Sequence, residues 1–235
     1  MKTIGLVGGM SWESTVTYYR LINEAVRDRL GGLHSAKCVL YSVEFAEVAV
    51  LQREGRWEEA TQLLLAAAQA LEKAGAECAL ICTNTMHKVA EAVQAGLRIP
   101  LLHIVDATAE HVRRAGLRRV GLLGTTFTME EDFYPGRLAR RFGLETMIPD
   151  PTDREQVHRI IFDELCQGRI QPAARATLSR IMNRLAERGA EAIILGCTEL
   201  GLLVNEGDGP VPVFDTTRLH ALAAVDFALP PGAAA

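Results

Sequence analysis

The sequence lacks the features that mark secreted or membrane proteins. No stretch approaches the ~18 apolar residues that a membrane-spanning helix needs. At the N-terminus, Met1-Lys2-Thr3 runs straight into the strand-like Ile4-Gly5-Leu6-Val7, without the long apolar region of a signal peptide. We therefore expect a cytoplasmic protein with no membrane partner.

An excess of basic charge is also missing. The 25 Lys and Arg residues are outnumbered by 29 Asp and Glu, which gives a formal net charge of −4. The two signs are interspersed along the chain, so no basic face for nucleic acid is expected. The default partner is a small molecule.

Cysteine and histidine do not form the patterns of a disulfide framework or a metal site. The five cysteines make an odd count without CxxC pairing, which argues against both disulfides and structural zinc. The histidines have no metal-ligand spacing either, so no metal is expected. Five histidines are assigned no role: His34, His103, His111, His158 and His220.

Apolar runs alternate with segments of helical periodicity along almost the whole chain, which predicts α/β architecture with parallel sheets covered by helices. The Ala/Pro/Gly-rich tail at 229–235 is expected to be loose. Strands are expected at 3–7, 38–43, 78–82, 101–105, 120–123, 145–148 and in the run that starts at Ala192. Helices are expected after the glycine turn at Gly8-Gly9 and at 57–74, 86–94, 107–115, 132–142, 154–166 and 172–188.

Three matches in the same order indicate an internal duplication. Residues 4–8 (IGLVG) match 120–124 (VGLLG) at an offset of 116, residues 75–77 (GAE) match 189–191 at 114, and residues 104–108 match 213–217 at 109. A repeat of this length is a domain rather than a solenoid unit.

The duplication predicts two similar flavodoxin-like α/β domains, residues 1–105 and 106–215, related by a pseudo-twofold axis. A C-terminal helix at about 216–229 is expected to join the first domain. The active site is expected in the cleft between the domains, where ligand sites are common.

The strand that begins at Ala192 ends in Gly196-Cys197-Thr198-Glu199, and chemistry in open α/β sheets collects beyond the carboxyl ends of strands. The offset of 114 pairs Cys197 with Thr83. Cys82 lies one residue earlier, and a one-residue shift on a strand turns the side chain to the opposite face. The repeat therefore selects Thr83, and not Cys82, as the counterpart of Cys197.

Four motifs together resemble the cofactor-independent aspartate/glutamate racemases over nearly the whole chain. This group is related to hydantoin racemases, maleate isomerases and arylmalonate decarboxylases. The motifs are residues 8–14 (GGMSWES), 83–87 (TNTMH), 124–129 (GTTFTM) and 196–199 (GCTE).

The resemblance implies a pyridoxal-independent racemase of L-aspartate, L-glutamate or both, without a cofactor and assembled as a homodimer. Cys197 as a thiolate would remove the α-proton, and a proton would return from the Thr83 side. The family usually has cysteine at the first position, and Thr83 is similar to the L-aspartate/glutamate-specific subgroup. Because a thiol ionises near pKa ~8.5 and an aliphatic hydroxyl has no accessible anion near neutral pH, we predict faster turnover from L than from D. Helix N-termini and polar neighbours can lower the pKa of such a thiol, which is the direction expected for Cys197.

Supporting residues follow from the same resemblance and from their place at strand-to-helix turns. N-capping is the alternative role for the polar ones. Arg53 would pair with a substrate carboxylate, although a solvated charge at a helix start is an equal reading. Glu199 is expected to orient the thiol or hold the second loop, with a surface position as an equal alternative, and His87 is expected to be structural or to orient the first loop. The expected substrate contacts are Met10, Gln52, Arg53, Asn84, Thr85, Thr125, Thr128 and Thr198.

Two further positions carry expectations. Trp12 is expected in the core. Cys166 stands where the family usually has a lysine, which weakens the case for an acidic substrate side chain.

Two other functions stay open. A decarboxylase or isomerase of the same superfamily would use one thiol. A two-domain amino-acid-binding protein would explain carboxylate-binding loops but not a thiol at the strand end.

Overall fold

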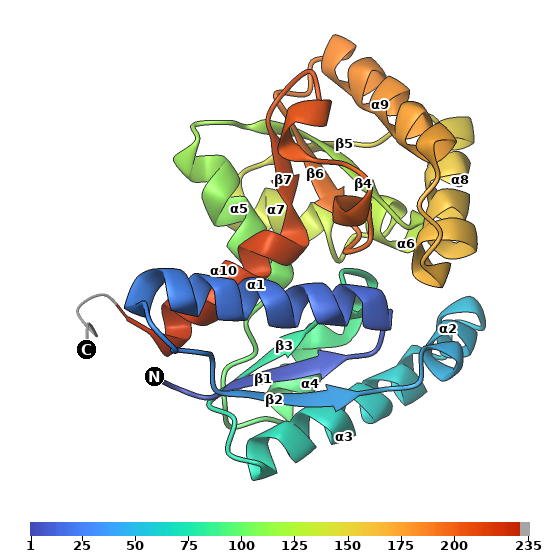
Figure 1. Ribbon diagram of the computed structural model, residues 1–235. Helices are drawn as coiled ribbons and strands as arrows, with labels where there is room; N and C mark the ends of the chain where they lie inside the picture. Colours follow the sequence, from blue (N-terminus) through green and yellow to red (C-terminus); the bar gives the residue numbers. More distant parts are fainter. Residues whose placement is uncertain (231–235) are drawn as a thin grey trace. The chain divides into compact units, whose positions relative to one another are not determined.

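The computed structural model describes residues 1–230, and the chain divides into two compact units (Figure 1). The first contains Met1–Ile104 and the segment that begins at His220, and the second contains Val105–Leu219. Most of the tail predicted to be loose, residues 231–235, lies outside the described residues.

The first unit is built on a three-stranded parallel sheet in the order β2-β1-β3. Its strands are β1 (Ile4–Gly8), β2 (Cys38–Ser42) and β3 (Cys78–Ile81). Every residue of β1 and β3 is buried, because helices cover both faces of the sheet.

The helices of this unit form two layers. On one face, α1 (Trp12–Leu30) and α10 (Thr216–Ala228) pack against Ile4 and Leu6 of β1. On the other face, α3 (Trp57–Lys73) and α4 (Ala90–Ala95) pack against Val7. The helix α2 (Phe45–Arg53) follows β2, and the 3₁₀ helix η1 (Thr85–Val89) follows β3.

The second unit has a four-stranded parallel sheet in the order β5-β4-β6-β7. Its strands are β4 (Arg119–Gly124), β5 (Glu145–Met147), β6 (Ala192–Gly196) and β7 (Val213–Asp215). Its helices are α5 (Ile104–Arg114), α6 (Thr126–Glu130), α7 (Pro135–Phe142), α8 (Pro151–Arg159) and α9 (Pro172–Glu187). Shorter segments are the π-helix η2 (Ile160–Glu164) and the 3₁₀ helices η3 (Leu165–Gln167), η4 (Leu200–Leu202) and η5 (Glu206–Asp208).

Three strands of each sheet share one order, and the two central strands of each sheet pair in the same register. In the first unit Ile4 pairs with Cys78, and in the second Val120 pairs with Ala192, which are the same positions after offsets of 116 and 114. Both units are therefore α/β folds with the central strand order of flavodoxin-like sheets.

A glycine recurs where a helix crosses each central strand. A Cβ at Gly5 would lie 3.2 Å from Leu71 Cβ of α3, and a Cβ at Gly121 would lie 3.3 Å from Leu185 Cβ of α9. The offsets 116 and 114 relate these pairs as well, so the close helix-strand contact is duplicated with the strands.

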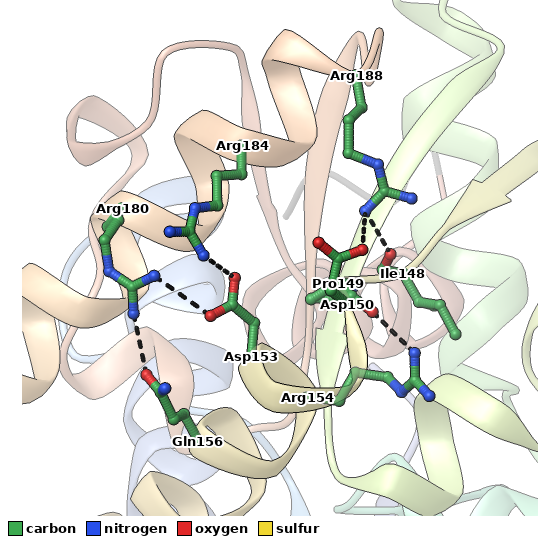
Figure 2. Close-up of polar contacts among 9 residues, drawn as sticks. All are labelled: Ile148, Pro149, Asp150, Asp153, Arg154, Gln156, Arg180, Arg184 and Arg188. Atoms are coloured by element: carbon green, nitrogen blue, oxygen red, sulfur yellow. Dashed lines mark hydrogen bonds and ion pairs between the residues drawn. The ribbon is translucent and has the colours of Figure 1, made fainter.

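Ion pairs connect α8 to α9 in the second unit (Figure 2). The side chain of Asp153 is 5% exposed and accepts hydrogen bonds from Arg180 (3.2 Å) and Arg184 (2.9 Å). Arg188 donates to the Ile148 carbonyl at 3.1 Å, and Arg154 donates to the Pro149 carbonyl at 2.9 Å. The two arginines on Asp153 hold α9 against α8, and the other two hold the turn between β5 and α8.

Several predicted elements differ from the structure. The strand expected at 101–105 is wrong, because this segment makes one bridge, between Ala79 and Leu101, before α5 begins at Ile104. The helix expected at 132–142 begins at Pro135, a residue suited to the first helical turn, and α6 precedes it as a separate helix. The helix α2 was not predicted.

Trp12 was expected in the core and is instead 65% exposed, because α1 turns Ser14, Thr15 and Tyr18 inward at its N-terminal end. Within residues 1–230, no helix combines the length and the apolar composition needed to cross a membrane.

Candidate active site

Three polar residues follow β3 at the carboxyl edge of the first sheet. Thr83 is 9% exposed, Asn84 1% and Thr85 5%, so all three side chains are largely removed from solvent. Cys82 lies in the apolar cluster with Ile4 and Leu80, where burial raises the pKa of its thiol.

His87 fixes the loop that contains Thr83. Its Nδ1 lies 2.7 Å from the Thr83 carbonyl oxygen, and its Nε2 accepts a 3.1 Å hydrogen bond from the Ile104 N–H. Because a carbonyl can only accept, the proton resides on Nδ1 and the ring is neutral. His87 thus joins the loop after β3 to the start of α5.

Two other histidines surround His87. The ring centroids of His103 and His220 lie 4.5 and 5.7 Å from that of His87. His220 Nδ1 is 2.8 Å from the Tyr18 hydroxyl, and its Nε2 donates to the Leu102 carbonyl at 2.8 Å. Burial lowers the pKa of His220 to about 4. In the part of the chain that the structure describes, no group of three or more His, Cys, Asp or Glu residues could hold a metal ion.

Met10 and Gln52 belong to the same region of the first unit. Both are buried, and Gln52 Nε2 contacts Met86 Sδ of η1 at 3.0 Å. Arg53 is the last residue of α2 and is exposed. The reading of Arg53 as a charge at a helix start is therefore wrong, because it stands at a helix end.

Cys197 immediately follows β6, the strand equivalent to β3. It is 6% exposed, and its Sγ donates a 2.9 Å hydrogen bond to Glu199 Oε2. The Thr198 hydroxyl donates to the same oxygen at 2.9 Å. Glu199 is 2% exposed, so its reading as a surface residue is wrong and its contact with the thiol is direct.

The environment of Cys197 favours the protonated thiol. Burial raises the pKa of Cys197 well above its ordinary value, and the negative charge of Glu199 and the neighbouring Cys166 raise it further. The Glu199 backbone N–H acts in the opposite direction and is outweighed. The expectation of a lowered pKa is therefore wrong, because the thiol is buried and because its polar neighbour is a carboxylate.

Thr125 and Thr128 lie in the turn after β4. The Thr125 hydroxyl caps α6 by accepting the Thr128 N–H at 3.3 Å, and the two hydroxyl oxygens are 3.2 Å apart. N-capping, which was the expected alternative to substrate binding, is therefore confirmed for Thr125. Asn84 occupies the N-cap position of η1, but its side chain makes no capping hydrogen bond.

Two threonines that sequence reasoning did not assign support the loop of Cys197. Thr216 donates its hydroxyl to the Leu195 carbonyl at 2.7 Å, and Thr217 donates to the Thr198 carbonyl at 3.3 Å. Both begin α10 directly after β7. The repeat at 213–217 pointed to this segment, but it does not reveal which carbonyls the hydroxyls reach.

Comparisons with known proteins found similarity to racemases and racemase homologues. The family model described as Asp/Glu/Hydantoin racemase matches residues 7–224. The crystal structure of a "putative Asp/Glu Racemase" from Yersinia pestis is 55% identical, with a TM-score of 0.90, and covers 97% of this chain and 100% of that chain. PH1733, an aspartate racemase homologue from Pyrococcus horikoshii, is 38% identical, with a TM-score of 0.84 and coverage of 97% and 99%. The broad specificity amino-acid racemase RacX of Bacillus subtilis is 23% identical over 94% of this chain and 96% of its own length.

Proposed function

The chain belongs to the Asp/Glu/hydantoin racemase family, and we propose that the protein is a pyridoxal-independent racemase acting on L-aspartate, L-glutamate or both. The observation that carries the proposal is the shared register of the two sheets. Extending that register by the offset of 114 makes Thr83, two residues after β3, the counterpart of Cys197, which follows β6. Two equivalent loops suit a reaction that handles a proton on both faces of one carbon.

In the proposed reaction, the thiolate form of Cys197 takes the α-proton of the L-enantiomer onto Sγ, which restores the thiol, and the electron pair of the C–H bond stays on the substrate. The α-carboxylate then gains enediolate character, which hydroxyls and backbone amides of the strand-end loops stabilise. The Thr83 hydroxyl returns a proton to the opposite face and is replenished from water. We propose Met10, Gln52, Arg53, Asn84, Thr85, Thr125, Thr128 and Thr198 as the residues that hold the substrate.

Deuterium exchange tests this proposal. The pure protein is incubated without added cofactor in deuterium oxide with a panel of L-amino acids, and α-deuteration and D-isomer are measured. We expect both with aspartate or glutamate, and loss of both in Cys197→Ser, which preserves size but replaces the thiol with a much weaker acid. Turnover confined to neutral amino acids would contradict the substrate assignment, and no exchange from any amino acid would contradict the racemase itself.

A hydroxyl at Thr83, in place of a thiol, also suits a decarboxylase or isomerase that uses Cys197 alone. Such an enzyme would release carbon dioxide from a disubstituted malonate, or isomerise a double bond, and would leave amino acids unchanged. Assays of both substrate classes on the same preparation separate this second candidate from the racemase.

We also propose a homodimer, which the resemblance to the family supports. Light scattering coupled to size-exclusion chromatography gives the mass directly. A mass equal to the 25.6 kDa chain would contradict the dimer.

A further inference from the structure

We propose that Glu199 accepts the proton of the Cys197 thiol when that thiol becomes the base of the reaction. The inference rests on the proposed racemase function and gives Glu199 a chemical role beyond orienting the loop. Its basis is direct contact, since Glu199 Oε2 lies 2.9 Å from Cys197 Sγ and the residue is 2% exposed. The Thr198 hydroxyl donates to the same oxygen and holds it in place.

The other titratable groups near the thiol do not offer the same contact. Cys166, in η3, also raises the pKa of Cys197, but it is a thiol and not a carboxylate. Asp215 ends the neighbouring strand β7, but its Oδ1 accepts the Thr217 N–H at 2.8 Å and the Arg218 N–H at 3.5 Å, so it serves the start of α10. The neighbouring turn after β4 contributes the uncharged Thr125 and Thr128. Glu199 is therefore the carboxylate in contact with the thiol.

Charge decides which route the thiol proton can take. If the proton leaves for water, a thiolate forms beside the Glu199 carboxylate, and two negative charges share one buried site. If the proton moves across the hydrogen bond to Oε2, the pair keeps one negative charge throughout. The same carboxylate that opposes ionisation of Cys197 to solvent thus provides the low-cost path for ionisation within the pair.

The protons balance over a turnover. The S–H bond breaks as the O–H bond forms on Glu199, and the resulting thiolate takes the substrate α-proton, which restores the thiol. The proton on Glu199 then leaves to water, while water replaces the proton that Thr83 delivers to the other face. No oxidant, reductant or further reactant is consumed.

Replacing Glu199 with glutamine separates this role from simple orientation. A glutamine side-chain oxygen can still accept the thiol hydrogen bond, but a neutral amide is not a base. If Glu199 only orients the thiol, Glu199→Gln keeps the exchange activity or raises it, because the thiol ionises more readily without the negative charge. If Glu199 accepts the proton, ionisation becomes easier while catalysis falls.

The first measurement follows Cys197 in the free protein. Alkylation by iodoacetamide is quantified at a series of pH values by mass spectrometry of the Cys197 peptide, which distinguishes this thiol from the other four. We expect the midpoint in Glu199→Gln to fall by about one pH unit or more relative to the wild type. The exposed Glu155→Gln on α8 is the matched control, and its midpoint should equal that of the wild type.

The second measurement is deuterium exchange from the L-enantiomer. We expect exchange in Glu199→Gln to fall about 10²-fold or more, the range typical of a lost acid-base group. Wild-type kcat/KM should be level between about pH 7 and pH 9, because the proton stays within the pair, whereas a thiol that ionises to solvent gives a tenfold rise per pH unit. Glu199→Asp keeps the charge but withdraws the carboxylate, so its alkylation midpoint should stay near that of the wild type while exchange falls.

The outcomes separate this inference from the function on which it rests. Exchange in the wild type that persists undiminished in Glu199→Gln overturns the role of Glu199 and leaves the racemase intact. Absence of exchange in the wild type overturns the racemase and the inference with it. Circular dichroism shows whether each variant is folded, and the pH profile of wild-type kcat/KM decides the question if Glu199→Gln is not.

Discussion

His87 Nδ1 donates a 2.7 Å hydrogen bond to the carbonyl oxygen of Thr83, four residues earlier in the chain. The other nitrogen of the ring accepts from the Ile104 N–H, so one neutral side chain ties the loop after β3 to the start of the next helix. The position of the proposed proton-returning hydroxyl thus depends on a histidine that need not carry charge.

Substitution of His87 should reveal this dependence. His87→Asn preserves a donor close to the place of Nδ1, whereas His87→Leu removes it and leaves the Thr83 carbonyl and the Ile104 N–H without this partner. We expect His87→Leu to lower kcat about tenfold more than His87→Asn, and each lost hydrogen bond to cost about 1–3 kcal/mol in urea unfolding. Equal kcat in the two variants would show that the hydrogen bond does not position Thr83.

The repeat predicts opposite results for the alanine variants of Cys197 and Cys82. Cys197→Ala should lower α-proton exchange by at least about 10³-fold, because it removes the proposed base. Cys82→Ala should retain exchange and lose about 1–2 kcal/mol of unfolding free energy, because its thiol fills space among buried apolar side chains. Loss of exchange in a folded Cys82→Ala would overturn the assignment of Thr83.

The hydroxyl of Thr83 predicts unequal rates from the two enantiomers. Wild-type wash-in of deuterium should be faster from L than from D, since removal of the proton from D requires a base on the Thr83 side. Thr83→Cys supplies an ionisable thiol there, and exchange from D should rise tenfold or more, by the general acid-base range. The matched Thr83→Ser keeps a hydroxyl and should not gain D activity. Equal wild-type rates would contradict the asymmetry.

The buried His220 predicts a loss of stability on acidification. Its folded pKa is about 4, below its ordinary value of 6.5, so between these values the unfolded chain binds a proton that the folded chain does not. Unfolding is therefore favoured as the pH falls below about 6.5, by about 2 kcal/mol at pH ~5.

Urea unfolding at pH ~7.5 and ~5 measures this effect, and His220→Gln isolates the histidine from other groups that titrate in the window. The free energy of unfolding at pH ~7.5 exceeds that at pH ~5, and this excess should be about 2 kcal/mol smaller in His220→Gln than in the wild type. An unchanged difference would show that His220 does not cause the loss.

The ion pairs between α8 and α9 predict a stability contribution at Asp153. Asp153→Ala should lower the unfolding free energy by about 1–3 kcal/mol, since two arginines lose a carboxylate that is 5% exposed. Asp150, whose side chain is 70% exposed beside Arg188, is the matched control. Asp150→Ala should change stability by less than about 0.5 kcal/mol. A similar loss in both variants would contradict the importance of burial.

The sequence by itself determined the α/β class, the duplicated strands and the equivalence of Thr83 with Cys197. These follow from local patterns, because an apolar run that ends in polar residues occupies consecutive positions and the repeat can be aligned without the structure. The offsets of 116 and 114 found in the sequence are the same offsets that relate the strand registers.

Only the tertiary structure decided how each site residue is connected. The carboxylate of Glu199 was visible two residues after Cys197, but its hydrogen bond to the thiol depends on how the chain folds after β6. The support from Thr216 and Thr217 and the gathering of His87, His103 and His220 depend on segments far apart in the chain. The direction of the pKa shift at Cys197 also depends on the tertiary structure, because burial and a neighbouring charge are properties of the packed structure and not of the residue order.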